Sequence, residues 1–584
     1  MHRALRWLRR VGGVAAACTL ALPVTATVAT AAPAAPAHHG GGSAVPIRLM
    51  SFNDLHGNLT PPAGSSGRVT LADGSTVDAG GAAYLATHVT QLRKAARHSV
   101  LLSTGDNIGA SPLNSALFHD EPTIEFLNDL KVAASVVGNH EFDEGYRELL
   151  RMQFGGCHPT DGCQFRPRFS GARFPYLGAN VTFDNGRPAL LPFSVTFSGG
   201  VPIGIIGVTL RDLPSVVVPT AVQGLKFGDE VTAIDKTANL LDKLGVKTQV
   251  VLLHQGDNSD ADPATPNGPD DCNVAAGGPA TAIARAASPK VDVIFTGHSH
   301  QQYDCTVKDP AGQPRTVIQG LSFGRLVSVV DVQVDRRTRD VIRSRTSSFN
   351  EVVTRTVPAD PKIQALVDLA TSKSAPIANR QVGTITADLV RAAPASGESP
   401  LGDVIADAQL EATTGNGAQI AMTNPGGIRT DLTYASSPAG EGDGVVTYGE
   451  AFAVQPFANI MQTITLTGAQ LDAVLEQQWQ QQQDGTVVSR ILQISSTLHY
   501  TQHPSAPLGS RVSDITVGGT PVDPAASYRV SVNNFLAAGG DGFTGFTAGT
   551  DLTGGPIDLD AFTAYLTAHP NLAPPAADRI TVAP

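Results

Sequence analysis

The chain has 584 residues, and its 41 basic and 52 acidic side chains give a formal net charge of −11. This length exceeds what one hydrophobic core organises, so two or three domains are expected. The acidic balance argues against general binding to nucleic acid or to anionic membranes. A phosphate ligand would need local cations to overcome the negative field, and bound metal ions could supply them.

The N-terminus has the pattern of a secretory signal, because four arginines precede an apolar, alanine-rich run and Ala-Pro-Ala repeats. We expect a signal peptide over residues 1–34, with cleavage between Ala29 and Ala37. Lipid attachment at Cys18 is the alternative, disfavoured because the apolar run continues beyond that residue. No later run is long and apolar enough to span a bilayer. The mature protein is therefore predicted to be secreted, soluble and monomeric.

Residues 46–345 alternate strand-like and helix-like segments, which predicts a layered α/β domain with helices covering the faces of a β-sheet. The helical periodicity of residues 230–244 stops at Gly245, as expected at the C-terminus of a helix. A long excursion rich in Pro, Gly and Asp next to a candidate ligand is more often functional than accidental. These segments are helices at 82–96 and 230–244, strands at 201–208 and 327–332, a turn at 185–188 and the excursion at 257–278.

The four cysteines beyond Cys18 agree with export. Cys157 and Cys163 flank a polar loop, and Cys272 and Cys305 flank a histidine-bearing strand end. We predict the disulfides Cys157–Cys163 and Cys272–Cys305. A zinc site built from these cysteines is the alternative, but the chain lacks the C-x-x-C spacing that such sites use.

Five apolar, strand-like runs each end in Asp, His or Asn. Ligand sites in open α/β sheets lie beyond the carboxyl ends of the strands, so we expect these side chains to converge. A single Gly-Asn-His suits a plain turn, but fivefold recurrence favours a site. The runs and their ends are 47–52 with Asn53-Asp54-Leu55-His56-Gly57, 99–103 with Thr104-Gly105-Asp106-Asn107, 133–137 with Gly138-Asn139-His140-Glu141-Phe142-Asp143, 249–253 with His254-Gln255-Gly256-Asp257, and 291–295 with Thr296-Gly297-His298-Ser299-His300.

These ends supply the hard oxygen and borderline nitrogen donors that two divalent ions need, with Asp106 as the natural bridge. Such a pair suits phosphate-ester hydrolysis, in which one ion activates a hydroxide for in-line attack and both ions clamp the phosphoryl oxygens. We assign His140 to the transition-state phosphate or the leaving oxygen, and Asp143 to orienting it. The predicted ligands are Asp54, His56, Asp106, Asn139, His254, His298 and His300.

A linker is predicted at 346–380, containing a helix over 361–372 that ends before Pro376. A second α/β domain is predicted over 381–584. We expect helices at 399–413 and 469–482, the latter ending in a Gln-rich, solvated surface, and strands at 460–466 and 528–532. Asn424 and Arg429 lie around a Gly turn suited to phosphate or ribose. From the residues alone, Phe457 and Phe535 are better read as core aromatics than as a base clamp.

The motifs D-x-H, G-D-N, G-N-H-E-x-x-D, a strand-end His and G-H-x-H occur in this order, and they resemble those of the calcineurin-like metallophosphoesterases. With the following domain, the chain looks like the 5'-nucleotidase / 2',3'-cyclic phosphodiesterase family over essentially its whole mature length. The resemblance implies two ion sites that share Asp106. One would use Asp54, His56, Asp106 and His300, and the other Asp106, Asn139, His254 and His298. Some relatives carry Gln in place of His300.

The resemblance also implies that a nucleobase stacks between Phe457 and Phe535, while Asn424, Arg429 and Asp541 hold nucleoside and phosphate groups. Relatives often carry an Arg where this chain has Gly397, and Arg391 is the nearby candidate replacement. In similar enzymes the base pocket and the metals belong to different domains, so a domain rotation about residues 360–380 is implied.

The predicted function is therefore a secreted, two-metal hydrolase that releases phosphate from nucleotides. A 2',3'-cyclic-nucleotide phosphodiesterase or a UDP-sugar hydrolase with the same site is the alternative, as is a phosphatase of general specificity. A non-catalytic cell-surface interaction protein would show broken ligand motifs, and here all are intact. Zn, Mn and Co all fit these ligands.

Overall fold

A computed structural model describes residues 44–62, 64–217, 219–259, 267–274, 277–437, 440–481 and 487–583. The predicted signal peptide over 1–34 lies outside these residues. Within the described ranges, no helix combines the length and the apolar character needed to cross a bilayer.

Two six-stranded sheets form the centre of the N-terminal region. In each sheet four consecutive strands pair in parallel, and the other two strands pair antiparallel with their neighbours. The first sheet has the order β16 (Ser347–Val352), β15 (Leu326–Asp335), β1 (Ala44–Phe52), β4 (Ser99–Ser103), β5 (Ser135–Val136), β6 (Tyr176–Leu177). The second has the order β13 (Gln302–Lys308), β14 (Pro314–Gly320), β12 (Val293–Thr296), β11 (Thr248–His254), β9 (Val201–Thr209), β8 (Phe193–Ser198).

The central strands are buried on both faces. Along β11, Val250 and Leu252 pack into the core between the sheets, while Val251 and Leu253 pack into the core beneath the helices. Successive side chains of a strand point to opposite faces, so a strand covered on both sides reads as a continuous apolar run. This arrangement explains the unbroken apolar segments in the sequence.

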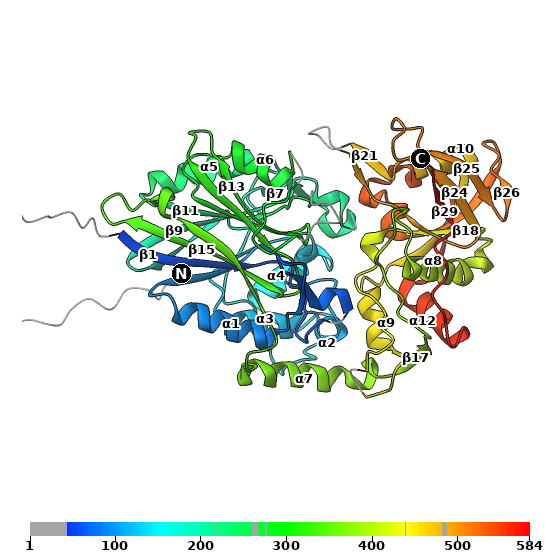
Figure 1. Cartoon of the computed structure of the whole chain (residues 1–584), viewed down its shortest axis with the longest axis horizontal. Helices are drawn as coiled ribbons and strands as arrows, with labels where there is room; N and C mark the ends of the chain where they lie inside the picture. Colours follow the sequence, from blue (N-terminus) through cyan, green and yellow to red (C-terminus); the bar gives the residue numbers. More distant parts are fainter. Residues whose placement is uncertain are drawn as a thin grey trace, which may run out of the picture. The chain divides into compact units, whose positions relative to one another are not determined.

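Helices cover the outer faces of both sheets, which confirms the predicted layered α/β class. Figure 1 shows α1 and α7 on one side of the sheets, and α5 and α6 on the other. The helices over the first sheet are α1 (Ala82–Lys94), α2 (Leu113–Ala116), α3 (Glu121–Leu130), α4 (Tyr146–Phe154) and α7 (Pro361–Ala378), and those over the second are α5 (Glu230–Lys243) and α6 (Pro279–Ala286). The division of the strands between two sheets was not foreseen.

Helix α7 is longer than predicted. It runs to Ala378 with Pro376 inside it, so the predicted stop before that proline was wrong. A proline inside a helix removes a backbone hydrogen bond and strains the helix around it. Pro376 lies close to the end of α7, so this disruption is confined to the end of the helix. Leu366, Val367 and Ala370 bury the body of the helix against the core of the first region. Strand β16 also lies within the predicted linker and extends the first sheet beyond residue 345.

The C-terminal region has a five-stranded and a four-stranded sheet. The first has the order β23 (Gln493–Ile494), β18 (Ile420–Thr423), β27 (Ser527–Asn533), β20 (Ile460–Thr467), β28 (Thr550–Ile557). The second has the order β26 (Thr520–Pro521), β25 (Val512–Val517), β24 (Leu498–Gln502), β29 (Ile580–Val582). The helices are α8 (Pro400–Thr413), α9 (Tyr448–Val454), α10 (Gly468–Glu476), α11 (Asn534–Ala537) and α12 (Asp558–Ala568).

Four two-stranded ribbons complete the described structure. They pair β2 (Arg68–Thr70) with β3 (Thr76–Asp78), β7 (Val181–Phe183) with β10 (Leu225–Phe227), β17 (Gln381–Thr384) with β19 (Val445–Thr447), and β21 (Trp479–Gln481) with β22 (Val487–Ser489). Both regions belong to the compact unit Ser43–Pro584.

Helix α10 ends at Glu476, not at 482, and the Gln-rich stretch after it is solvated only in part, with Gln481 exposed. Gln478 is fully buried, where it accepts the N–H of Leu492 at 2.8 Å. The chain then continues as β21, which buries Trp479. Side-chain amides that satisfy buried backbone groups overrode helix propensity here.

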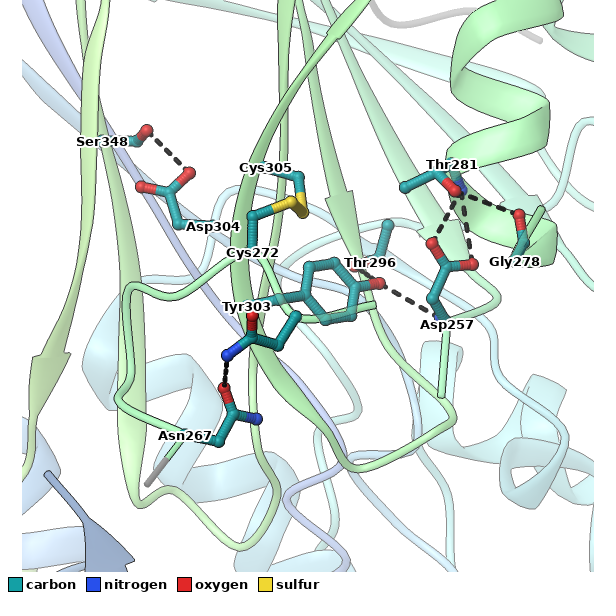
Figure 2. The surroundings of a disulfide bond; sticks show 11 residues. Asp257, Asn267, Cys272, Gly278, Thr281, Thr296, Tyr303, Asp304, Cys305 and Ser348 are labelled. Carbon is teal, nitrogen blue, oxygen red and sulfur yellow. Dashed lines mark hydrogen bonds between the residues drawn. A yellow bond between two sulfur atoms is a disulfide. The ribbon is translucent and has the colours of Figure 1, made fainter. Parts of the chain in front are cut away.

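Both predicted disulfides are present. Cys272–Cys305 joins the excursion after β11 to strand β13 (Figure 2). Asp257, at the start of this excursion, accepts the N–H groups of Ala280 and Thr281 at 2.6 and 3.0 Å at the start of α6. Residues 260–266 and 275–276 of the excursion lie outside the described residues.

Candidate functional site

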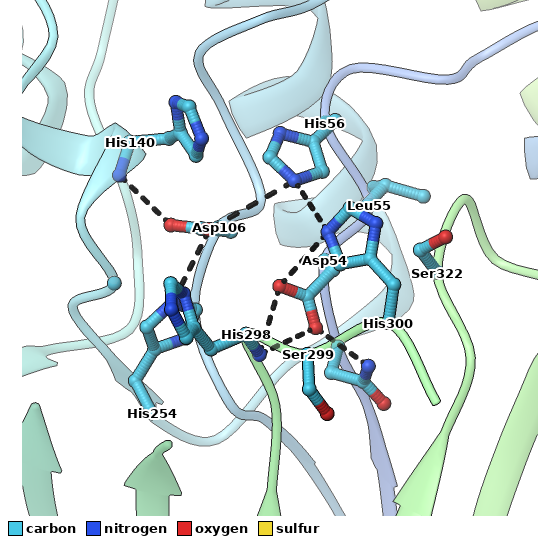
Figure 3. Close-up of polar contacts among 12 residues, drawn as sticks. Asp54, Leu55, His56, Asp106, His140, His254, His298, Ser299, His300 and Ser322 are labelled. Atoms are coloured by element: carbon cyan, nitrogen blue, oxygen red, sulfur yellow. Dashed lines mark hydrogen bonds and ion pairs between the residues drawn. The ribbon is translucent and has the colours of Figure 1, made fainter. Parts of the chain in front are cut away.

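Six of the seven predicted metal ligands lie together at one end of the two sheets (Figure 3), and the seventh, Asn139, contacts two of them. The first sheet contributes residues after β1, β4 and β5, and the second contributes residues at the ends of β11 and β12. Each ligand residue follows a strand, as the sequence predicts, and these strands belong to two different sheets. The first sheet provides Asp54, His56, Asp106 and Asn139, and the second sheet provides His254, His298 and His300.

Five of these residues have a left-handed backbone conformation. Their φ angles are 50° at Asp54, 45° at His56, 48° at Asp106, 71° at His298 and 56° at His300. Residues other than glycine avoid this region, and such strain concentrates at functional sites. Close packing adds a second constraint, because a Cβ on Gly138 would collide with Asp106 and His254.

One group of donors surrounds His56. Its Nε2 lies 3.2 Å from Nε2 of His300 and 3.8 Å from Oδ2 of Asp106. Oδ1 of Asp54 lies 3.5 Å from Nε2 of His300. Asp54, His56 and His300 therefore form a cluster that could hold a cation.

The second group surrounds Asn139. Its Oδ1 lies 3.3 Å from Nε2 of His254 and 3.0 Å from Nδ1 of His298. Oδ2 of Asp106 lies 3.2 Å from Nε2 of His254. Asp106 therefore contacts both groups, which is the position predicted for a bridging carboxylate.

Backbone carbonyls orient two of the histidines. Nδ1 of His56 donates to the carbonyl of Gly109 at 2.8 Å, and Nδ1 of His254 donates to that of Thr104 at 2.6 Å. Each bond leaves Nε2 facing the cluster, as in metal-binding histidines whose second nitrogen is held by an oxygen acceptor. The donor set and its orientation therefore fit divalent cations.

Burial sets the protonation of most of these rings. Burial and the Arg429 guanidinium lower the pKa values of His56 and His300 well below the usual range. Burial, with His254 nearby, lowers the pKa of His298 to about 3. Burial also lowers the pKa of His254, but the Asp106 carboxylate outweighs it and raises that pKa to about 9. A dication beside Asp106 would favour the neutral form of His254.

Glu141 is a site residue to which the sequence assigned no role. Its carboxylate accepts the N–H groups of Asp106 and Asn107, both at 2.9 Å, and of Gly138 at 2.6 Å. It thereby ties the turn after β4 to the turn after β5. Burial and the nearby Asp106 carboxylate raise the pKa of Glu141 to about 7. Its place two residues after Asn139 was the signal available.

His140 and Asp143 form the predicted pair. Nδ1 of His140 donates to Oδ2 of Asp143 at 2.8 Å, and its backbone N–H donates to Asp106 at 2.9 Å. Burial alone would lower the pKa of His140, but the Asp143 and Asp106 carboxylates outweigh it and raise that pKa. The ring stacks on Phe457 with a centroid separation of 5.6 Å.

The C-terminal region brings Arg429 to the same place. Nη2 of Arg429 lies 3.4 Å from Nε2 of His56, and its guanidinium lies 5.6 Å from the centroid of Phe457. Asn424 donates to Asp541 at 2.8 Å, and Phe535 packs against Gly540, the residue before Asp541. Phe457 and Phe535 are both only partly buried, so neither is an ordinary core aromatic.

A cavity of about 490 Å³ lies over the cluster. Arg325, which the sequence did not single out, lines it with its guanidinium bonded to the carbonyls of Ser322 and Arg68, both at 3.0 Å. At Gly397, φ is +77° and a Cβ would collide with Ile491, so a larger residue does not fit. The cavity lining includes Asp106, His140, His300, Arg325, Arg391 and Arg429.

Two family models match the chain, calcineurin-like phosphoesterase over residues 47–302 and 5'-nucleotidase, C-terminal domain, over residues 381–548. Cell wall protein Lmo0130 of Listeria monocytogenes is 31% identical over 572 residues, which cover 94% of this chain and 69% of that protein. Endonuclease YhcR of Bacillus subtilis is 30% identical over 529 residues, covering 89% of this chain. The chain spans 40% of the length of that endonuclease.

Among solved structures, the 5'-nucleotidase precursor from Thermus thermophilus superimposes with a TM-score of 0.74 and 26% sequence identity. The match covers 92% of this chain and 99% of that one. The architecture of both regions is therefore shared with a solved two-region protein.

Proposed function

This chain belongs to the calcineurin-like phosphoesterases that carry a 5'-nucleotidase C-terminal domain, a family of metal-dependent phosphoester hydrolases, and we propose that it releases phosphate from nucleotides with two divalent ions. One observation carries the two-ion proposal. Oδ2 of Asp106 lies 3.8 Å from Nε2 of His56 and 3.2 Å from Nε2 of His254, between the two donor groups. A carboxylate in that position suits a bridge between two cations.

In this proposal, Asp54, His56, Asp106 and His300 hold one ion, and Asp106, Asn139, His254 and His298 hold the other. When bound, the ions activate the attacking water and neutralise charge on the phosphoryl group. The neutral rings of His56, His298 and His300 suit this role, because a protonated imidazole cannot bind a cation. Zn, Mn and Co remain equally compatible with the donors.

The phosphoryl group would enter the cavity between the cluster and the arginines. His140 is positioned to contact a phosphoryl or leaving oxygen through Nε2, because Asp143 holds its Nδ1 proton. The Asp143 and Asp106 carboxylates raise the pKa of His140 against the effect of burial, which favours the protonated ring as a proton donor. Arg429 and Arg391 would neutralise the remaining phosphate charge, and bidentate guanidinium contacts suit that task.

Nucleoside recognition would come from the C-terminal region. Phe457 and Phe535 offer partly exposed rings for a base, and Asn424 and Asp541 offer hydrogen-bonding groups for the ribose. Stacking on an aromatic ring contributes about 1–3 kcal/mol per base. Because Phe457 also stacks on His140, it would contact both the base and the histidine that faces the phosphate.

We further propose that the protein acts outside the cell as a monomer. The two disulfides support an oxidising compartment. A relative described as a cell wall protein supports an extracellular location. A 2',3'-cyclic-nucleotide phosphodiesterase or UDP-sugar hydrolase using the same site is the second candidate, since the metal centre alone does not fix the leaving group.

Phosphate release from AMP by the purified mature protein tests the proposal, with chelator and then with Mn²⁺ or Zn²⁺ restored. We expect chelation and Asp106→Ala to abolish release. Phe535→Ala should raise the KM for AMP roughly 10–100-fold, from the stacking energy above, yet spare p-nitrophenyl phosphate. Phe197→Ala is the matched control, because Phe197 is exposed on β8.

Comparing AMP with 2',3'-cyclic AMP and UDP-glucose separates the two candidates. No release from any nucleotide by a metal-loaded protein would contradict both and favour a non-catalytic interaction role. Release from AMP that Phe457→Ala and Phe535→Ala leave unchanged would indicate a phosphatase of general specificity.

A further inference from the structure

A second cluster of metal-binding side chains lies outside the active site. His119 occupies the turn between α2 and α3, and Glu144 precedes α4. His158 and Asp161 lie in the loop after α4, which the Cys157–Cys163 disulfide closes. None of these four residues contributes to the site described above. Two imidazoles and two carboxylates in one place are a donor set typical of Zn²⁺ and related ions.

Donor atoms of three of these residues lie close together. Nε2 of His119 lies 2.8 Å from Oδ2 of Asp161, and Nδ1 of His158 lies 3.4 Å from the same oxygen. The two rings stack with centroids 3.8 Å apart and an interplanar angle of 15°. His119, His158 and Asp161 therefore form a triad within reach of a single ion.

Glu144 orients the central histidine. Nδ1 of His119 donates to Oε2 of Glu144 at 2.8 Å, which leaves Nε2 directed at Asp161. A carboxylate that holds one ring nitrogen while the other faces the ion is the usual support of a metal-binding histidine. Glu148 is the other carboxylate near His119, but Arg151 binds both of its oxygens at 2.6–2.9 Å.

The loop that carries two of the donors is already ordered. The disulfide closes a ring from Cys157 to Cys163, and His158 and Gly162 pair across it through two backbone hydrogen bonds of 3.2 and 2.9 Å. His119 has a left-handed backbone, with φ +49°, and its ring is held by Glu144 and Asp161, each at 2.8 Å. Little conformational freedom would be lost when an ion binds, which favours binding.

We propose that His119, His158 and Asp161 form a third divalent-metal site, with Glu144 as the carboxylate that orients His119. The side chain of Asp161 is 48% exposed, so solvent molecules complete the coordination shell on that side. Binding through Nδ1 of His158 replaces the hydrogen bond that this atom accepts from the N–H of Asp161 at 3.2 Å. The ion cross-links the α2–α3 turn to the disulfide loop.

Counting bound Zn²⁺ tests the site. Wild type, His158→Gln and Asp161→Asn are dialysed against low-micromolar Zn²⁺ and their metal content is measured by plasma mass spectrometry. We expect each variant to hold one ion fewer than wild type and to hydrolyse the preferred substrate within about twofold of it. His499→Gln, a histidine on β24 of the C-terminal region, is the matched control and should hold the wild-type number.

The difference between wild type and variant is independent of how many ions the active site holds, so failure of the two-ion proposal would not obscure it. Equal Zn²⁺ content in wild type and both variants would overturn the third site. Anomalous scattering from Zn²⁺-soaked crystals of the wild-type protein covers the case in which a variant does not fold. A peak at His119 supports the site, and no peak there contradicts it.

Discussion

Replacing Glu141 with glutamine tests how the two turns that carry Asp106 and Asn139 are held together. Oε2 of Glu141 accepts the N–H groups of Asp106 and Gly138, and Oε1 accepts that of Asn107. A glutamine keeps one acceptor oxygen and turns its NH₂ group toward the third N–H. Above pH 7, where Glu141 is ionised, at least one charge-assisted bond is lost and the other two become neutral.

The expected cost follows from these three bonds. Hydrogen bonds to charged groups contribute about 1.5–3 kcal/mol each. Losing one and weakening two should lower the free energy of unfolding by about 2–4 kcal/mol. Because the same turns position Asp106 and Asn139, metal affinity should fall about 10–100-fold, as it does when an outer hydrogen-bond partner is removed from other metal sites.

Urea unfolding and the metal concentration that gives half-maximal activity measure the two effects. Glu230→Gln is the matched control, because Glu230 is also buried and accepts a backbone N–H, that of Arg211 at 2.6 Å, at the start of α5. The control should lose stability without losing metal affinity. Unchanged stability and metal affinity in Glu141→Gln would refute the reasoning.

Three further outcomes are expected. Burial raises the pKa of Asp403 in the folded protein to about 8. The stabilising contribution of its proton is therefore complete below the unfolded-state pKa of about 4 and is lost as pH rises through 8. We expect the urea midpoint of Asp403→Asn to rise relative to that of wild type between pH 5 and 8, and parallel midpoints would contradict this. His140→Gln should lower kcat about 10²–10⁴-fold. Asp143→Asn should lower kcat less and alter the pH–rate profile, which would show that the aspartate acts through the histidine. Arg429→Lys should raise the KM for AMP, because one ammonium cannot replace a bidentate guanidinium; unchanged kinetics would remove Arg429 from the phosphate site.

The sequence predicted the convergence of the site well, because a strand end is a local feature. Asp54, Asp106, Asn139 and His254 follow short apolar runs, and any parallel arrangement of those strands brings their ends together. The disulfides were predictable for the same reason, since each pair brackets one recognisable segment. The layered α/β class followed from alternating apolar periods.

What the sequence did not reveal depends on tertiary contacts. The strand ends do not say which sheet each strand joins. Pro376 looks like a stop signal until the packing of α7 is known. Gln478 looks solvated until its amide is found bonded to Leu492. The position of Glu141 two residues after Asn139 suggests a place in the site but not its role, because two of its three partners, Asp106 and Asn107, belong to a turn that only the fold brings near.

The division of the donors between the two sheets has a mechanical consequence. Each donor group joins residues of the first sheet to histidines of the second, with Asp54 and His56 facing His300, and Asn139 facing His254 and His298. Cations bound there would resist sliding of one sheet over the other and would offset the strain of the left-handed turns. Metal supply would then govern the lifetime of the protein as well as its turnover, because a metal-free domain would open more readily and expose its backbone to proteases.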